Sequence, residues 1–372
     1  MRIARADLYR YRLALRAPVA LRAPVALRAP VALHVGAIEA REGLLLRLEC
    51  ADSGAVGWGE AAPLPGFSPD TLEATEATLR ALVAVLRRAG RHPEDPVLDL
   101  DPLHPGPAAR FAVETAVVSA DARRRGVAET DVLAEATGCR PGRRLALAGL
   151  VAAGDDPGEA AERLVRGGYC AAKLKVGGAP AAAARAARAF ARALGDDVAL
   201  RLDANRAWNY DEALRFADAL GDAAIDYLEE PLADPQGLPA LAEATGLPLA
   251  LDESLVGLAP SDLAGHGFAR AAVLKPLVGG GLRWAIAMAA EARRLGLEPV
   301  VSGAFESGVG TRALLAFAAT CAPAPAGLDP YNRLAEDVLA RRLAIARAEV
   351  DVPAALAHPA VREAALEPLD VA

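Results

Sequence analysis

Several features are missing from this sequence of 372 residues, and each absence excludes a class of protein. No run of about 18 uninterrupted apolar residues occurs, so no transmembrane helix is expected. No GxGxxG or GxxxxGKS/T motif follows a predicted strand, which disfavours a nucleotide-binding fold. The N-terminus lacks the continuous apolar core of a signal peptide. The four cysteines show no CxxC or other paired spacing, so we expect them to be reduced in a cytoplasmic protein (Cys50, Cys139, Cys170 and Cys321).

Positive charge is also in deficit. The net charge of −7 at pH 7 and the isoelectric point near 5.4 argue against nucleic acid as the main partner. A basic cluster at residues 123–125 directly precedes Gly126, which is typical of an exposed helix C-terminus. We therefore expect a small-molecule partner, and neither nucleic acid nor membrane. The sequence does not indicate the oligomeric state.

The first hundred residues predict a small α+β unit. Residues 7–15 and 41–50 have strand patterns, and residues 70–90 have helical periodicity with a glycine stop. Between the strands, RAPVAL occurs three times in tandem at residues 16–33, and a proline every six residues disfavours both helix and central strand. We interpret this repeat as an expanded loop. Residues 92–107, rich in Pro, His and Asp, are the best linker candidate, so the unit is expected to span residues 1–104.

From about residue 110 onward, short apolar strands alternate with alanine-rich helices such as residues 180–194. Eight successive β/α units favour an α/β fold with a parallel barrel over an open doubly wound sheet. The barrel is expected to span residues 105–330. The predicted strands are residues 145–153, 170–176, 198–204, 225–230, 247–253, 271–276, 298–303 and 326–330.

Charged residues mark the carboxyl ends of five successive predicted strands, where a barrel builds its active site. They are Lys175, Asp203, Glu229, Asp252 and Lys275, spaced by 28, 26, 23 and 23 residues. Three converging carboxylates repel each other unless a cation lies between them, and an all-oxygen ligand set favours Mg²⁺, with Mn²⁺ possible. The alternative is that each acid only caps a strand end or forms a salt bridge.

Lysine is scarce: it supplies three of the 41 basic residues, and the other 38 are arginine. Lys173 and Lys175 lie two residues apart, so they share one strand face, and neighbouring cations lower each other's pKa. A lysine that loses its proton can act as a base, whereas arginine stays protonated. We therefore predict catalytic roles for Lys175 and Lys275 and a supporting electrostatic role for Lys173. The alternative is a lysine that only pairs with a nearby acid. Lysine bases beside a divalent metal suit proton abstraction next to a carboxylate, with the enediolate stabilised by the metal.

In this order along the chain, the motifs KLKVG, RLDANRAW, LEEPL, ALDES and LKP resemble the muconate-lactonising branch of the enolase superfamily. Four further stretches resemble the o-succinylbenzoate synthase family within that branch: GWGEAAPLPGFSPDTLE, RFAVETA, SGAFESGVG and GLDPYNRLAEDVL. The resemblance covers nearly the whole chain. It implies a (β/α)₇β barrel with an α+β capping domain, to which the C-terminal segment, residues 331–372, returns.

The resemblance also implies roles for individual residues. Asp203, Glu229 and Asp252 would be the metal ligands, with Glu230 a less favoured second choice for the middle one. Arg201, two residues before Asp203, would orient Lys175 and the substrate; the alternative is a salt bridge on the outside of the barrel. The loop of residues 66–70 would close over the barrel mouth. The substrate would meet Ser302, Gly303 and Glu306, although Glu306 could instead be an acid in the first turn of the next helix.

The implied reaction is syn dehydration of 2-succinyl-6-hydroxy-2,4-cyclohexadiene-1-carboxylate in menaquinone biosynthesis. Lys175 would remove the α-proton and then protonate the departing hydroxyl, while Lys275 would stay cationic.

The closest alternatives are an N-acylamino acid racemase, a dipeptide epimerase or a cycloisomerase with the same machinery. Dipeptide epimerases usually carry D-x-D on the eighth strand, where this chain has only Asp329. A metal-free Schiff-base lyase and a non-catalytic barrel are more remote alternatives. The RAPVAL repeat is the clearest departure from the family.

Overall fold

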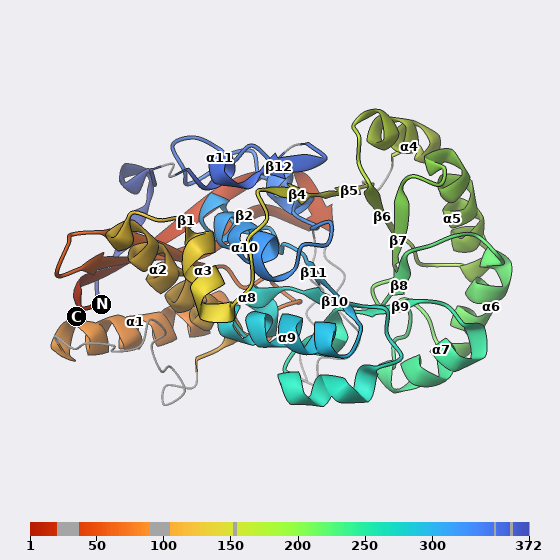
Figure 1. Cartoon of the computed structure of the whole chain (residues 1–372), viewed down its shortest axis with the longest axis horizontal. Coiled ribbons are helices and arrows are strands. Elements are labelled where there is room, and N and C mark those ends of the chain that lie inside the picture. Colours follow the sequence, from red (N-terminus) through yellow and green to blue (C-terminus); the bar gives the residue numbers. More distant parts are fainter. Residues whose placement is uncertain (21–36, 90–104, 152–154, 346, 358–359, 372) are drawn as a thin grey trace.

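The computed structural model describes residues 1–20, 37–89, 105–151, 155–345, 347–357 and 360–371. Two sheets organise it (Figure 1). One is a four-stranded antiparallel sheet in the order β13-β1-β2-β3, and the other is a seven-stranded parallel sheet in the order β11-β10-β9-β8-β7-β6-β5. The predicted class, an α/β barrel beside an α+β unit, is confirmed.

The antiparallel sheet packs against two helices. It contains β1 (Ile3–Ala20), β2 (Ala37–Cys50), β3 (Val56–Ala61) and β13 (Glu367–Leu369). Helices α1 (Leu72–Ala89) and α2 (Pro107–Arg125) pack against it. The backbone of α2 lies so close to β3 that a Cβ at Gly59 would be 1.8 Å from the Ala112 carbonyl oxygen. Glycine at this position is therefore a packing requirement.

The first RAPVAL copy differs from the prediction of a loop. Residues 16–20 continue β1, with Val19 opposite Ile38 after a register shift. Among the described residues, β13 pairs with β1 at Leu8–Arg10 and Leu15 is bridged to Leu334, so Pro18 lies beyond the part of β1 that is paired on that side. Proline is tolerated there because no ladder N–H is required. The rest of the repeat, and the predicted linker up to residue 104, lie outside the described residues.

The parallel sheet curls, and its helices lie along its outer side (Figure 1). Its strands are β5 (Ala148–Leu150), β6 (Ala171–Lys175), β7 (Ala199–Asp203), β8 (Tyr227–Glu229), β9 (Leu249–Leu251), β10 (Ala271–Leu274) and β11 (Glu298–Val301). The helices are α4 (Pro157–Arg166), α5 (Pro180–Leu194), α6 (Tyr210–Leu220), α7 (Leu238–Thr245), α8 (Pro276–Gly279), α9 (Leu282–Arg294) and α10 (Gly308–Cys321). Shorter elements complete the chain: α3 (Glu129–Thr137), β4 (Arg144–Ala146), β12 (Glu349–Asp351), α11 (Val352–Leu356), and the 3₁₀ helices η2 (Pro235–Gly237), η3 (Glu253–Leu255), η4 (Pro260–His266), η5 (Asp329–Arg333) and η6 (Glu363–Ala365).

Local sequence explains where these helices lie. In α5, the buried residues recur three or four positions apart and form one apolar stripe: Ala183, Ala184, Ala187, Phe190 and Leu194. In α6, Asn209 and Glu212 form a capping box, in which each side chain accepts the other's backbone N–H. Such caps fix the loops that leave the carboxyl ends of the strands.

Two residues join the edges of the parallel sheet. Ala326 exchanges backbone hydrogen bonds with the β4–β5 segment, and Gly327 does so with the end of β11. The predicted strand at residues 326–330 is thus reduced to two bridge pairs, because η5 begins at Asp329 and Pro330. The barrel is therefore closed only over this short stretch.

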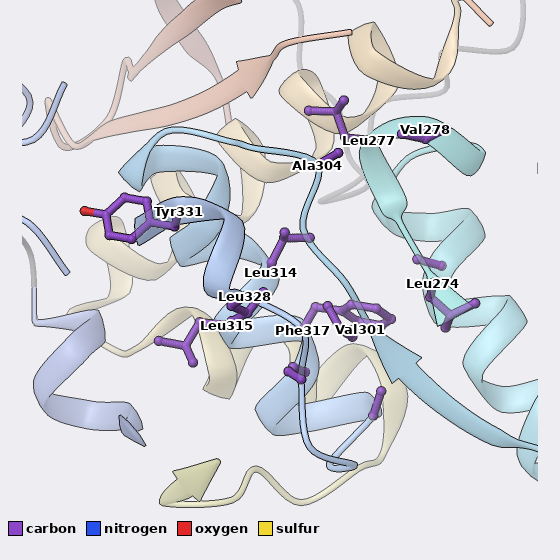
Figure 2. Packing of buried hydrophobic residues seen from close by; sticks show 14 of the residues in the cluster. Leu274, Leu277, Val278, Val301, Ala304, Leu314, Leu315, Phe317, Leu328 and Tyr331 are labelled. Atoms are coloured by element: carbon purple, nitrogen blue, oxygen red, sulfur yellow. The ribbon is translucent and has the colours of Figure 1, made fainter. Parts of the chain in front are cut away.

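Helix α10 is buried along nearly its whole length and contacts β11. Figure 2 shows Leu314 and Phe317 of this helix among Val301, Leu274 and Leu328. Within the described residues, none of the helices is long and apolar enough to span a membrane.

Candidate active site

The predicted layer of charged residues forms at the carboxyl ends of the parallel strands. In the strand register, Lys175 is opposite Asp203, and Asp203 is opposite Glu229, so these three residues share one level. Asp252 directly follows β9, and Lys275 directly follows β10. Because β7, β8 and β9 separate β6 from β10, the carboxylates lie between the two lysines along the curled sheet.

The ammonium group of Lys173 bridges two of the carboxylates. Lys173 Nζ lies 2.7 Å and 2.9 Å from the two oxygens of Glu229, and 2.9 Å from Asp203 Oδ2. Burial works to lower the pKa of Lys173, but the attraction of Asp203 and Glu229 outweighs it and raises that pKa well above its usual value. The expectation that neighbouring cations lower the pKa of Lys173 is therefore wrong, since its closest partners are anions.

The carboxylates respond differently to this arrangement. Burial and the negative charge of Asp203 raise the pKa of Glu229 well above its usual value. Burial also acts to raise the pKa of Asp203, but the three lysines, Lys173 first, overcome it and lower that pKa. Both carboxylates are almost completely buried, so their charges depend on the cations beside them.

Lys175 has the most accessible ammonium group of the layer. Its side chain is 61% exposed, and its Nζ lies 4.0 Å from Asp203 Oδ2. It donates a 2.7 Å hydrogen bond to Asn205 Oδ1. Asn205 has a left-handed backbone (φ 43°) and donates its own N–H to Asp203 Oδ1. Asn205 lies in the RLDANRAW motif, but no role was predicted for it, because a side-chain amide in a loop carries no distinctive spacing.

Lys275 is enclosed from two sides. Its ammonium group pairs with Asp252, and it lies 4.4 Å from the centre of the Phe67 ring. Burial acts to lower the pKa of Lys275, but the negative charges of Asp252, Glu229 and Glu253 together outweigh it and raise that pKa. Phe67 belongs to the segment between β3 and α1, so residues 66–70 do reach the barrel mouth as expected. The residue in contact with Lys275 was not predicted.

Glu230 is already bound by protein groups. Its Oε1 accepts the N–H groups of Asp252 and Ser254, and its Oε2 accepts from Arg206 and the Ser254 hydroxyl. This carboxylate supports the loop after β9. The neighbouring Glu229 accepts from Lys173 instead, and the choice of Glu229 as the metal ligand stays a prediction.

Arg201 lies at the opposite end of the barrel from its predicted position. Its guanidinium donates to Asp226 Oδ2 at 2.9 Å and to the Pro325 carbonyl at 2.7 Å, and it pairs with Glu298. These groups stand at the amino ends of their strands, away from Lys175. Because Arg201 and Asp203 are two residues apart, the sequence correctly placed both side chains on the same face of β7. A long side chain can nevertheless extend toward either end of its strand. The structure therefore differs from the expected contact with Lys175.

The predicted substrate-binding residues follow β11. The backbone N–H of Ser302 is bonded to Leu274 O, and that of Gly303 to Gly327 O. Glu306 precedes α10 instead of lying in its first turn, and its Oε2 accepts the N–H of Ala304 at 2.6 Å. Burial raises the pKa of Glu306 to about 7. Its Oε1 is buried and has no hydrogen-bond partner among the described residues.

The acid Glu253, next to Asp252, was not predicted. Burial, followed by the negative charges of Asp252 and Glu230, raises the pKa of Glu253 to about 8. Its Oε1 accepts from Asn205 Nδ2 at 3.4 Å, and its Oε2 is buried with no hydrogen-bond partner in the part of the chain that the structure describes. The ALDES motif contains this acid, but nothing in its spacing distinguishes it from an ordinary loop residue.

The chemistry of these donors fits a hard divalent cation, although no three acidic, histidine or cysteine side chains within the described residues are gathered as a preformed metal group. The reason is visible in the contacts: Lys173 and Lys275 stand against the carboxylates. Asp203, Glu229 and Asp252 are buried carboxylates from adjacent strands, and burial together with the charges of Asp203 and Asp252 raises the pKa of Glu229. A hard cation bound by these oxygens would offset this repulsion.

Family models match most of the chain. Residues 3–116 match the family described as MenC, N-terminal domain, and residues 156–356 match the one described as Enolase C-terminal domain-like. The o-succinylbenzoate synthase of Enterobacter sp. (strain 638) is 34% identical over 310 residues, which cover 82% of this chain and 87% of that protein. Protein PHYLLO of Arabidopsis thaliana is 30% identical over 348 residues, 82% of this chain, but the chain spans only 20% of its length.

Solved structures share the fold over almost the full chain. The muconate lactonizing enzyme from Pseudomonas putida has a TM-score of 0.79 with 25% identity, covering 98% of both chains. A dipeptide epimerase from Cytophaga hutchinsonii, complexed with Mg and a dipeptide, has a TM-score of 0.81 with 20% identity, covering 99% of both chains. Fold and charged layer together define a barrel enzyme of the enolase type. The chain belongs to the o-succinylbenzoate synthase family of the enolase superfamily, and it is an enzyme of the lyase class.

Proposed function

We propose that the chain dehydrates 2-succinyl-6-hydroxy-2,4-cyclohexadiene-1-carboxylate to 2-succinylbenzoate, a step of menaquinone biosynthesis. The observation that carries this proposal is the layer in which Lys175 and Lys275 flank Asp203, Glu229 and Asp252. The family models and the relatives named o-succinylbenzoate synthase support the choice of reaction. The domain division at residues 104 and 330 is proposed with it.

Lys175 is the proposed base and acid. Its side chain is exposed, and a hydrogen bond to Asn205 holds its ammonium group without enclosing it. As the neutral amine it takes the proton next to the substrate carboxylate. As the ammonium group it returns that proton to the departing hydroxyl, so that water leaves and the ring becomes aromatic. One group can serve both steps because the proton and the hydroxyl leave from the same face.

Lys275 is the proposed permanent cation. Its contacts with Asp252 and the Phe67 ring both favour the charged form. A cation held in a buried site stabilises the negative charge that develops on the substrate carboxylate after proton loss. Phe67 covers this cation and separates it from solvent, which strengthens the interaction.

A divalent cation, Mg²⁺ before Mn²⁺, is proposed as the cofactor, held by Asp203, Glu229 and Asp252. When bound, such an ion stabilises negative charge on the substrate carboxylate. The Mg²⁺ complexes of dipeptide epimerases with the same fold support this assignment. Within this chain, Lys173 is the residue whose contacts with Asp203 and Glu229 must loosen to admit the ion.

The test is a Mg²⁺-dependent assay for 2-succinylbenzoate with wild type, Lys175→Arg and Lys275→Arg. Arginine keeps the charge but transfers no proton, so Lys175→Arg should lose about 10²-fold to 10⁴-fold in kcat. Lys275→Arg should retain much more activity, because that position needs only a cation. Asp226→Asn, far from the layer, serves as the control.

A racemase or epimerase would give a different pattern, because it uses both lysines as bases. Wild type would then exchange the α-proton of N-acyl amino acids or dipeptides, form no 2-succinylbenzoate, and lose its activity equally in both variants. Asp329 argues against amine recognition, because its carboxylate accepts from Asn332 Nδ2 and pairs with Arg333 inside η5. Full activity of Lys175→Arg in the dehydration assay would refute the proton-transfer role itself.

A further inference from the structure

The carboxylate of Glu60 joins the antiparallel sheet to the barrel. Glu60 lies on β3 and is completely buried. Its Oε1 accepts from the Tyr11 hydroxyl and, at 2.8 Å, from the N–H of Ser307. Its Oε2 accepts from the Ser307 hydroxyl and, at 2.7 Å, from the N–H of Gly310. One side chain of β3 thereby binds β1 and the beginning of α10.

The first turn of α10 relies on groups from outside the helix. The first backbone N–H groups of a helix have no partner within it. Glu60 takes those of Ser307 and Gly310, Asp337 takes that of Gly308 at 2.8 Å, and the Ser307 hydroxyl takes that of Val309 at 3.2 Å. The position of this helix start is thus fixed by two carboxylates from distant parts of the chain.

The same contact requires glycine at residue 310. A Cβ there would lie 2.8 Å from Glu60 Oε2 and 2.8 Å from the Cβ of Glu306. The helix therefore approaches β3 as closely as its backbone allows. This close approach is a second observation, independent of the hydrogen bonds, that the two elements are built to meet.

Both ends of this contact lead to the candidate active site. Upstream of α10 lies the turn of residues 302–306, which leaves β11 at the barrel mouth. Downstream of Glu60, the chain reaches Phe67, whose ring covers Lys275. Between them, Arg41 donates to the carbonyl oxygens of Ala62 and Pro63 and fixes the base of that loop.

We propose that Glu60 is a positioning residue, which sets the turn of residues 302–306 and the loop that carries Phe67 relative to each other across the mouth of the barrel. It acts through Ser307 and Gly310 and does not touch the reacting atoms. The part of this inference that concerns substrate rests on the proposed function. The contact of Glu60 with Ser307 and Gly310 does not depend on that function.

The charge of Glu60 is required for a geometric reason. Each of its two oxygens accepts one backbone N–H, from Ser307 or from Gly310. In Glu60→Gln, the amide NH₂ must face one of these N–H groups, donor against donor, although the side chain keeps its size. Tyr11→Phe removes only a hydroxyl donor and leaves both backbone bonds. Glu42→Gln is the matched control, because Glu42 is a half-exposed acid on the adjacent strand, paired with Arg12.

The experiment measures hydrogen exchange of peptides covering residues 302–312, together with kcat and KM of the full chain in Mg²⁺. Glu60→Gln should speed exchange in that segment by about tenfold or more, because a buried hydrogen bond to a charged group is lost. Peptides covering β6 to β9 should exchange as in wild type. KM should rise by about tenfold with an unchanged Mg²⁺ activation constant. Tyr11→Phe should show smaller effects and Glu42→Gln none.

A merely structural role would lower the active fraction, and so the apparent kcat, without changing KM. That outcome, or wild-type exchange in residues 302–312, would overturn the proposal. Should Glu60→Gln fail to fold, Tyr11→Phe removes the hydroxyl donor to Oε1 while the N–H groups of Ser307 and Gly310 keep their bonds to Glu60, and it must show the same local exchange and KM effects at smaller size. If wild type forms no 2-succinylbenzoate, the proposed function fails, while the exchange comparison still decides the role of Glu60.

Discussion

Glu114 is an acid whose ionisation is opposed by the fold. It is buried in α2, and one of its oxygens accepts the N–H of Arg283 at 3.0 Å, at the beginning of α9. Burial raises its pKa to about 7, from an ordinary value of 4.5. Because the folded protein holds this proton more tightly than the unfolded chain, Glu114 contributes stability below about pH 4.5, and this contribution is lost as the pH rises toward 7.

Replacing Glu114 by glutamine should remove this pH dependence, because the amide oxygen can still accept from Arg283. Wild type should lose about 2 kcal/mol more stability than Glu114→Gln between about pH 5 and pH 8. The measurement is urea unfolding of both proteins at several pH values. If wild type and Glu114→Gln lost the same stability over this pH range, the assignment would be contradicted, because a trend that both proteins share arises from groups other than Glu114.

At the level of single residues, sequence predicted positions better than contacts. The charged layer was predictable because strand spacing fixes which residues return to the carboxyl ends. The partners of Arg201 and Lys173 were not predictable. The alternation of residues along a strand fixes the face on which a side chain lies, while the neighbouring carboxylates decide where the end of a long side chain lies. Asn205, Glu60 and Phe67 were not assigned roles, since each one's importance comes from a partner far away in the sequence.

Secondary elements were predicted best where the pattern is local. Helix α5 has the predicted bounds, and strands β6 and β7 lie within the predicted ranges. The eighth strand and the first RAPVAL copy were misjudged because pairing partners, not local propensity, determine where these strands end. Arg16–Ala20 is strand because β2 extends beside it, and residues 328–330 are not strand because η5 begins there.

The packing of α2 on β3 gives a prediction at this scale. Gly59→Ala places a Cβ 1.8 Å from the Ala112 carbonyl oxygen, so helix and strand must separate. We expect a loss of about 3 kcal/mol in the free energy of unfolding. Gly265→Ala in η4 is the control, since a Cβ there meets nothing within 4 Å. Urea unfolding of the two variants measures the difference, and equal stability would show that α2 can shift without cost.

On the scale of the whole molecule, the carboxylate layer predicts a link between Mg²⁺ and stability. An ion that binds only the folded protein stabilises it by about 2.7 kcal/mol at a hundredfold excess over Kd. Mg²⁺ should therefore raise the Tm of wild type in a concentration-dependent way, and EDTA should reverse the shift. Asp203→Asn should abolish the response, while Asp226→Asn should keep it, because Asp226 pairs with Arg201 at the other end of the barrel. An Asp203→Asn protein with the wild-type shift would place the ion elsewhere.

The closure of both sheets by late segments has a consequence for synthesis on the ribosome. Strand β1 is among the first residues made, yet its partner β13 comes from residues 367–369. The barrel likewise cannot join β5 to β11 before Ala326 and Gly327 have emerged. Domains commonly fold from the N-terminus during translation, but neither the four-stranded nor the seven-stranded sheet is complete until the last third of the chain has been made. Nascent chains that stall before residue 326 should therefore present open strand edges, the kind of surface that chaperones bind.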